Sequence, residues 1–480
     1  MKLLIAGGQV VTADGSTDAD VLVDDGRVAW VGRVPGADAD ADRVIDARGK
    51  LVMPGAVDMH THLEAPNNEI REAAIDALTC DDYHDGSIAA IVGGTTTLVD
   101  FATQNPGDGL IDSLEQCRAK LAARPLATDI GLHMIVADLG VPDAEAELAA
   151  LCDEGVTSFK LFMAYKESPL MIDDDTLFRV AQVAAANDAV VVVHAESGDA
   201  INVLQRQAVA AGDTAAIWHA RTRPPATEAE AVNRAIELCR VAGAALYIMH
   251  VSSAEALAVI ERAKRGGARV RAETCTHYLY VDESWLERPP EEACKFVFTP
   301  PPRSADDREA LWDALARGVL DVVSTDHCPY TLEQKRGGAH SFMATPNGVP
   351  GVENRLEVMF ELGVRGGRLS PSRLVELLCT EPARLYGMHP SKGTLSPGAD
   401  GDVVIFDPAA ERTLSVDSQI STADFCVFEG LRVSGSVDTV VRGGQVVVEN
   451  REYLADPGLG GFLARQRSAQ AFRIGQPTEA

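Results

Sequence analysis

The middle of this chain alternates short apolar runs with longer segments rich in alanine, glutamate, arginine and leucine. The runs are continuously hydrophobic, which is typical of parallel strands that helices cover on both faces. The segments between them, such as 228–242 and 254–265, have the length and composition of helices. Because no G-x-G-x-x-G follows the first strand, the alternation favours a (β/α)8 TIM-like barrel over a doubly wound dinucleotide-binding sheet. Eight runs carry the prediction: the one ending at Met59, then 95–99, 130–136, 158–163, 190–193, 245–249, 269–273 and 319–324.

Both ends of the chain differ from this middle part. The N-terminal end contains short strands broken by turns, and Asp25-Gly26 between two apolar runs is a strong hairpin signal. We expect a smaller β-sandwich domain formed from both chain ends, followed by a polar tail that is helical or disordered. Strand-like runs return after Gly393, at 402–406, 437–441 and 445–448. The predicted divisions are 1–54 and 386–455 for the two parts of the β-sandwich domain, 55–385 for the barrel, and 456–480 for the C-terminal tail.

Charge and composition restrict the partners. A net charge of −28 argues against nucleic acid and anionic membranes as partners, because neither attracts an acidic surface. No apolar stretch approaches the length of a spanning helix, and the first residues are too short an apolar run for a signal peptide. The nine cysteines form no C-x-x-C pair and are odd in number, which suits a reducing compartment. We therefore expect a cytoplasmic protein with a small-molecule substrate.

Polar residues stand at the ends of several predicted strands. In a (β/α)8 barrel the carboxyl ends of all strands meet at one mouth, where functional side chains gather. His60 and His62 are two residues apart after the first strand, so both imidazoles face the same side. The six candidates are His60, His62, Lys160, His194, His250 and Asp326.

Each candidate also has a simpler interpretation. A histidine after an apolar strand is usually a hydrogen-bonded core residue, and a lysine within such a run can extend its ammonium to the surface. Six ionisable groups buried at one mouth, however, are costly without a partner, and a divalent cation is the natural one. Four imidazoles with carboxylate oxygens suit zinc, and manganese or cobalt fits the same donors. The other histidines are interpreted as structural: 84, 133, 219, 277, 327, 340 and 389.

Six motifs together resemble one family. They are H-x-H, S-F-K-x-F-M-A-Y, V-H-A-E-S, M-H-V-S-S, S-T-D-H-C-P and P-N-G-x-P-G-x-E. The set resembles the cyclic-amide branch of the amidohydrolase superfamily, and most closely the dihydropyrimidinases and bacterial D-hydantoinases, over about residues 3–449. The resemblance implies two zinc ions per subunit, held by His60, His62, His194, His250 and Asp326. It also implies that Lys160 is an N6-carboxylysine, whose CO2-derived carbamate bridges both metals.

The resemblance further implies an activity, hydrolysis of a ring amide by metal-activated hydroxide. Asp326 would act as general base and then acid, and the Tyr165 hydroxyl would stabilise the developing oxyanion. Thr299 and Asn347 match positions where the family binds the amide edge of the substrate, largely through backbone groups. Members of the family usually form homotetramers, so we expect one here.

Several alternatives stay open. The substrate is a 5-monosubstituted hydantoin or a dihydropyrimidine, and another cyclic amidohydrolase, such as an allantoinase, is the alternative within the class. A dihydroorotase usually has an arginine near H-x-H, whereas Leu63 follows His62 here. A non-catalytic dihydropyrimidinase-like scaffold protein is less favoured, because all six ligand positions are occupied. The stretch from Leu63 to Gly94 differs from the shorter, glycine-rich loop of relatives. Because the loop 63–81 is expected to shape the pocket, the side group and stereochemical preference stay undecided.

Overall fold

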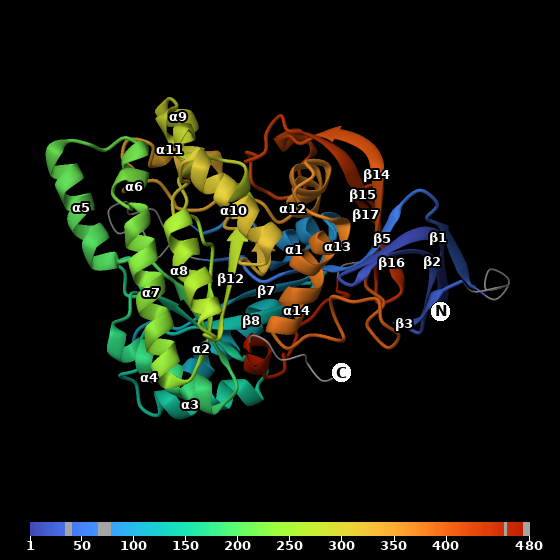
Figure 1. Cartoon of the computed structure of the whole chain (residues 1–480), viewed down its shortest axis with the longest axis horizontal. Helices are drawn as coiled ribbons and strands as arrows, with labels where there is room; N and C mark the ends of the chain where they lie inside the picture. The colour runs from blue at the N-terminus through green and yellow to red at the C-terminus, as the bar shows by residue number, and fades with distance from the viewer. Residues whose placement is uncertain (34–40, 66–77, 456–457, 474–480) are drawn as a thin grey trace.

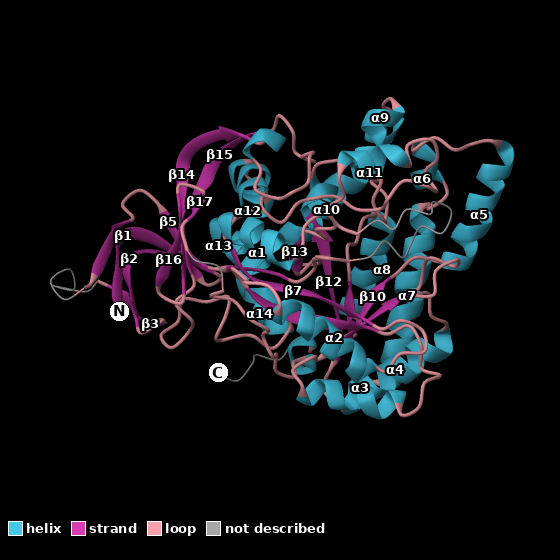
Figure 2. Cartoon of the chain, turned by 180° about the vertical axis from the view of Figure 1, so that it is seen from behind, coloured by secondary structure: helices cyan, strands magenta, loops and turns pink. Residues whose placement is uncertain are grey.

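The computed structural model describes residues 1–33, 41–65, 78–455 and 458–473. A barrel with helices around its outside makes up the larger part of the molecule, and a β-sheet lies beside it at one end (Figures 1 and 2). Within these ranges no helix is long and apolar enough to cross a membrane.

The barrel is built from eight parallel strands in the described part of the chain, hydrogen-bonded in sequence order. The first and last strands approach through a bridge between Thr61 and His327, so the sheet is nearly closed. Each of the eight predicted runs forms one strand, which confirms the predicted barrel. The strands are β6 (Ala56–Asp58), β7 (Thr95–Thr103), β8 (Asp129–Ile135), β9 (Ser158–Phe162), β10 (Val190–His194), β11 (Ala245–Ile248), β12 (Val270–Cys275) and β13 (Val322–Ser324).

Several helices, among them α1, α4, α8 and α10, begin at a residue whose side chain accepts from the first turn. α10 starts at a capping box made by Ser304 and Asp307, and it ends at Gly318 with a left-handed backbone. The two helix-like segments named from the sequence, 228–242 and 254–265, form helices α7 and α8. The described helices are α1 (Tyr83–Val92), α2 (Leu110–Ala122), α3 (Ala144–Asp153), α4 (Asp174–Ala186), α5 (Gly198–Ala211), α6 (Ile217–Arg221), α7 (Pro225–Ala242), α8 (Ala254–Arg265), α9 (Pro290–Ala293), α10 (Ala305–Arg317), α11 (Leu332–Gly337), α12 (Arg355–Met359), α13 (Pro371–Val375) and α14 (Glu381–Leu385).

In the described residues, both chain ends contribute to one nine-stranded sheet, as expected. Its central strand β5 (Leu51–Pro54) pairs in parallel with the N-terminal strand β1 and antiparallel with the C-terminal strand β14. Buried side chains from both ends, including Leu3, Val23 and Ile405, form its small core. The other strands are β1 (Lys2–Thr12), β2 (Gly15–Asp24), β3 (Arg27–Gly32), β4 (Arg43–Asp46), β14 (Val403–Thr413), β15 (Arg432–Arg442), β16 (Gln445–Glu449) and β17 (Glu452–Tyr453).

Gly55 connects this sheet to the barrel. It separates β5 from β6, and its amide donates to the carbonyl of Asp402 at 2.9 Å. A Cβ at this position would lie 2.2 Å from Oγ1 of Thr96. Only glycine therefore lets the chain pass directly from the sheet into the first barrel strand, which ends just before His60.

The C-terminal segment 458–473 differs from the prediction of a helical or disordered tail. It forms no helix or strand before a short 3-10 turn, η8 (Ala469–Phe472), and its hydrogen bonds with Ile130, Ser158 and Asp188 place it at the amino ends of the barrel strands. Leu463 donates to the carbonyl of Ile130, and the buried Arg465 guanidinium donates to Ser158 Oγ at 2.7 Å. This segment closes the end of the barrel opposite the carboxyl ends of the strands. Arg465 and Ser468 are buried within it, and their side chains donate to the Ser158 hydroxyl and the Leu385 carbonyl, a tertiary relation that composition does not show.

Candidate metal centre and active site

A cavity of about 200 Å³ opens at the carboxyl ends of the barrel strands. Its wall is contributed by residues from widely separated parts of the chain, and the structure brings every predicted site residue to it. These residues are His60, His62, Lys160, Tyr165, His194, His250, Thr299, Asp326 and Asn347.

The H-x-H segment continues the direction of β6. The amide of His62 donates to the carbonyl of His327 at 2.8 Å, which fixes the segment against the end of β13. His60 and His62 face the cavity, and their Nε2 atoms lie 3.3 Å apart. Thr61 points the other way and donates to Asp100 at 2.8 Å. The alternation expected of extended chain therefore places both imidazoles on one side.

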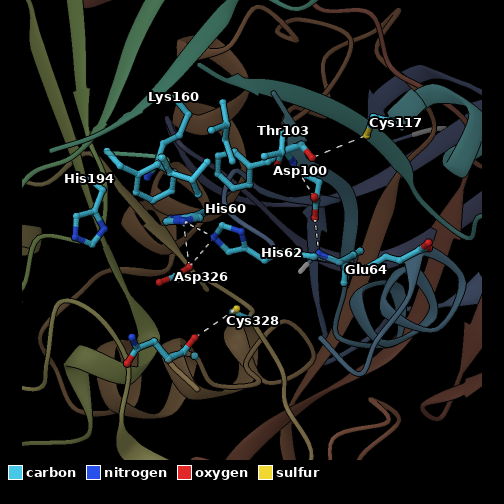
Figure 3. A pocket seen from close by; sticks show the side chains of 18 of the residues that line it. His60, His62, Glu64, Asp100, Thr103, Cys117, Lys160, His194, Asp326 and Cys328 are labelled. Carbon is cyan, nitrogen blue, oxygen red and sulfur yellow. Dashed lines mark hydrogen bonds and ion pairs between the residues drawn. The ribbon is translucent and has the colours of Figure 1, made fainter. Parts of the chain in front are cut away.

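Asp326 completes this half of the site. Its Oδ1 lies 3.1 Å from Nε2 of His60 and 3.1 Å from Nε2 of His62, and the three side chains point toward one another (Figure 3). Burial raises the pKa of Asp326, but the His60 and His62 imidazoles outweigh it and hold that pKa well below its ordinary value. Asp326 is therefore an ionised oxygen donor beside two nitrogen donors, and these three atoms lie close enough together to hold one cation.

His194, His250 and Lys160 form the other half. The His194 and His250 rings meet edge to face with their centroids 4.5 Å apart. The centroid of the His250 ring lies 5.4 Å from that of the His60 ring. Lys160 is the middle residue of β9, and its side chain is 1% exposed, with Nζ 4.7 Å from the centre of the Phe162 ring. The simpler interpretation of this lysine, an ammonium that reaches the surface, is thus wrong.

Two buried glutamates, which the sequence reasoning did not single out, orient the histidines. Oε1 of Glu273 lies 2.6 Å from Nδ1 of His60, and Oε2 of Glu196 lies 2.8 Å from Nε2 of His194. Metal-binding histidines usually donate their second ring nitrogen to such a carboxylate. A signal was present for both: Glu196 stands two residues after His194, and Glu273 lies near the end of β12.

The charge of Glu196 is balanced from its other side. Arg223, which is also buried, places NH1 2.6 Å from Glu196 Oε2, and its guanidinium carbon lies 5.3 Å from the centre of the Tyr165 ring. Burial raises the pKa of Glu196, but Arg223 and His194 outweigh it and lower that pKa to about 2. Burial lowers the pKa of His194 to about 4, despite the hydrogen bond to Glu196. His194 is therefore a neutral imidazole near pH 7, the state in which imidazole binds a cation.

The residues expected to contact a substrate line the same cavity. Tyr165 follows β9 with φ of +68°, an unusual backbone conformation for a tyrosine, and its ring centre lies 4.9 Å from that of His194. His250 and Asp326 also have positive φ, at +37° and +48°. Such strained residues gather at functional sites, where the surrounding structure holds them in place. Thr299 lies nearby, with Oγ1 3.2 Å from Nε2 of His219.

Comparison with known proteins agrees with this arrangement. Residues 51–447 match the amidohydrolase family, a span that includes the whole barrel. The chain belongs to the amidohydrolase family. The expectation that it is an enzyme of this family is confirmed.

The relatives place it in the hydantoinase and dihydropyrimidinase branch of the family. It is 42% identical over 471 residues to a D-hydantoinase of Ralstonia pickettii, covering 98% of this chain and 100% of the relative. It is 43% identical over 468 residues to a D-hydantoinase of Streptomyces coelicolor, covering 97% and 98%. Among solved structures, a dihydropyrimidinase from Brevibacillus agri superposes with a TM-score of 0.93 at 40% identity, covering 99% and 100% of the two chains. An L-hydantoinase from Arthrobacter aurescens superposes with a TM-score of 0.86 at 33% identity, covering 96% and 99%.

Two of the histidines interpreted as structural, His327 and His133, contact the H-x-H segment or the residue before it. Nδ1 of His327 accepts from the amide of Gly351 at 3.0 Å, so its Nε2 carries the proton that it donates to Asp81 at 2.9 Å. Because His327 also accepts from the amide of His62, it joins the H-x-H segment to the strand end that carries Asp326. The nitrogens of His133 lie close to a serine hydroxyl and a backbone carbonyl. Most of the loop predicted to shape the pocket, residues 66–77, lies outside the described residues.

Proposed function

We propose that this amidohydrolase-family enzyme hydrolyses the ring amide of a 5-monosubstituted hydantoin or a dihydropyrimidine. The observation that carries the proposal is the meeting of four imidazoles, one carboxylate and one lysine in a single cavity at the mouth of the barrel. The names of the relatives support the substrate class, because they are D-hydantoinases, a dihydropyrimidinase and an L-hydantoinase. Since both stereochemical types occur among them, the proposal does not choose between D- and L-substrates.

The donor set fits a pair of divalent cations. Nδ1 of His250 is buried and has no hydrogen-bond partner among the described residues, as expected of a nitrogen reserved for a metal. His60 and His194 each use one ring nitrogen on a glutamate and keep the other for the cavity. We propose that the cations are zinc, with manganese or cobalt possible, held by His60, His62, Lys160, His194, His250 and Asp326.

We propose that Lys160 is carboxylated on Nζ by CO2. In the unmodified form its positive charge adds to burial in lowering the pKa of His194 and of His250. A cation among metal ligands also opposes binding of a second cation. Carboxylation exchanges this charge for an anion with two oxygens, which removes the conflict without moving β9.

The residues of the chain then carry out proton transfer, oxyanion stabilisation and substrate binding. When bound, the cations supply Lewis acidity that lowers the pKa of a water molecule and polarises the ring carbonyl. The ionised Asp326 takes the proton of the attacking water and passes it to the leaving ring nitrogen. Tyr165 donates its hydroxyl proton in a hydrogen bond to the developing oxyanion. Backbone groups of Thr299 and Asn347 bind the amide edge of the ring.

Ring opening by metal-replete protein tests this function. Dihydrouracil is compared with hydantoins bearing small, aromatic and charged 5-substituents, and the loss of the ring is followed by absorbance. Opening of at least one of these rings is the expected result, and the preferred ring decides between the two substrate classes. Absence of turnover on all of them, with the metal bound, would contradict the proposal and favour another cyclic amide such as allantoin.

Glu196→Gln is expected to weaken metal binding by about 10–100-fold, the usual effect of removing the carboxylate behind a metal-bound histidine. The glutamine keeps the size of the side chain but removes the charge that orients His194 and pairs with Arg223. Titration with a competing chelator measures the change in affinity. Glu237→Gln is the matched control, because Glu237 pairs with Arg240 at the surface. Equal metal affinity in the Glu196 variant and the control would remove Glu196 from this role.

Tyr165→Phe is expected to lower kcat on the order of 100-fold with the metal content unchanged, because it removes one donor to the oxyanion and no metal ligand. The ring, its position beside His194 and its contact with Arg223 are all kept. Steady-state kinetics together with metal analysis measure the effect. An unchanged kcat would exclude the hydroxyl from the oxyanion role.

Two further properties concern the compartment and the assembly of the protein. The nine cysteines are free in the structure, which supports a reducing compartment, and we propose the cytoplasm. We also propose a homotetramer, on the family resemblance alone. The mass of the particle in solution, compared with 51.0 kDa for one chain, tests the second proposal.

A further inference from the structure

Lys335 is a buried lysine of the short helix α11, close to the active-site cavity. The helix begins at Thr331 with a capping box formed with Gln334, so its first turn is well defined. The Lys335 side chain is 0% exposed and points into the protein. An ammonium group is rarely buried to this extent, because leaving water is costly unless hydrogen bonds replace the lost hydration.

The hydrogen bonds of Lys335 link two separate segments of the chain. Its Nζ donates to the carbonyl of Val297 at 2.8 Å and to the carbonyl of Pro346 at 2.6 Å. The same Val297 carbonyl accepts from the amide of Gly348 at 3.2 Å. Three hydrogen bonds thus hold residues 297 and 346–348 side by side.

These two segments carry the residues expected to bind the amide edge of the substrate. Thr299 follows Val297 by two residues, and Asn347 follows Pro346 directly. Both residues line the cavity. Neither segment is part of a helix or strand at these positions, so no backbone ladder fixes the distance between them. The two hydrogen bonds of Lys335 and the single one from the Gly348 amide to the Val297 carbonyl therefore set that distance.

We propose that Lys335 is a positioning residue that sets the spacing between the Thr299 and Asn347 backbone groups, and through it the fit of the ring amide. The inference rests on the proposed function, in which those two residues hold the substrate. Lys335 itself touches neither the substrate nor the metal ligands in this proposal. Its loss should weaken ground-state and transition-state binding alike, because the amide edge stays in place throughout the reaction.

The test compares Lys335→Met with wild type in metal-replete enzyme. The methionine keeps a similar length and removes the ammonium, so KM is expected to rise about tenfold while kcat stays within about threefold. The metal content should be unchanged, because none of the proposed ligands contacts Lys335 in the proposal. Lys335→Gln, which retains a shorter hydrogen-bond donor, should give a smaller rise in KM. If the methionine variant does not fold, the glutamine variant tests the proposal, again by a rise in KM at nearly constant kcat.

Lys392→Met is the matched control. Lys392 is also a buried lysine, 5% exposed, but it binds Asp129 and Asp402 where the barrel meets the sheet. Its variant should lower the thermal midpoint and leave KM unchanged. If Lys335→Met behaves in the same way, Lys335 is only structural and the inference is overturned. If wild type opens none of the rings, the proposed function fails and the inference fails with it, whereas an active wild type with an unchanged KM in the variant overturns the inference alone.

Discussion

Lys160→Ala is expected to lower kcat by a factor on the order of 10³ or more and to reduce the bound metal below two equivalents per chain. Removing a carboxylate that only supports a ligand costs about 10–100-fold, and this substitution removes a proposed ligand of both cations. Lys160 is the middle residue of β9, and Val192 and Ile135 of the neighbouring strands pair with it, so the backbone has no reason to move. Metal analysis and steady-state kinetics of the same preparation measure both effects.

The variant also separates the carbamate from the unmodified lysine. Truncation to alanine leaves space for a short carboxylic acid, which can supply the missing anionic oxygens. We therefore expect acetate or propionate to restore part of the activity of Lys160→Ala and to have no such effect on wild type. Lys50→Ala is the control, because Lys50 forms an ion pair with Asp438 in the sheet, away from the cavity. Near-normal turnover of Lys160→Ala without added acid would exclude the carbamate role.

The sequence was most informative where one local rule determines the structure. Each of the eight runs became one barrel strand, as the alternation of short apolar runs with longer helical segments predicts. His60 and His62 face the same side because alternate residues of an extended chain do so. This local rule does not depend on the rest of the fold. His194 and Asp326 could be assigned to the same mouth because all parallel strands of a barrel end there.

Relations between distant segments were not visible in the same way. Glu273 lies 213 positions from His60, so its place near the end of a strand does not show that its carboxylate contacts His60 at 2.6 Å. Arg223 reaches Glu196 only because the chain after α6 returns to the end of β10. The prediction for the tail is wrong for the same reason: the composition around Arg465 is that of a surface segment, and only the fold places Ser158 and the Leu132 carbonyl beside its guanidinium. Sequence periodicity predicts on which side of a strand or helix a side chain lies. It does not predict which residue, far away in the sequence, contacts that side chain.

Asp326→Asn is expected to lower kcat on the order of 10⁴-fold, the upper end of what a general acid–base group contributes, because the same carboxylate is also a proposed ligand. Asparagine has nearly the same shape and can keep the left-handed backbone of φ +48°, so the position of the chain should be preserved. Asparagine cannot accept and return a proton. It also removes the negative charge that Oδ1 of Asp326 places 3.1 Å from Nε2 of His60 and of His62.

Metal analysis of Asp326→Asn separates its two roles. If the loss of activity persists when the metal content is restored to that of wild type by a high metal concentration, the missing function is proton transfer. If restored metal also restores turnover, Asp326 acts only as a ligand, and the general base is another group. Asp153→Asn is the matched control, since Asp153 pairs with Arg467 at the surface near the opposite end of the barrel. Activity of Asp326→Asn within tenfold of wild type would contradict both roles, because four imidazoles and a lysine would then suffice for the chemistry that the cavity is proposed to perform.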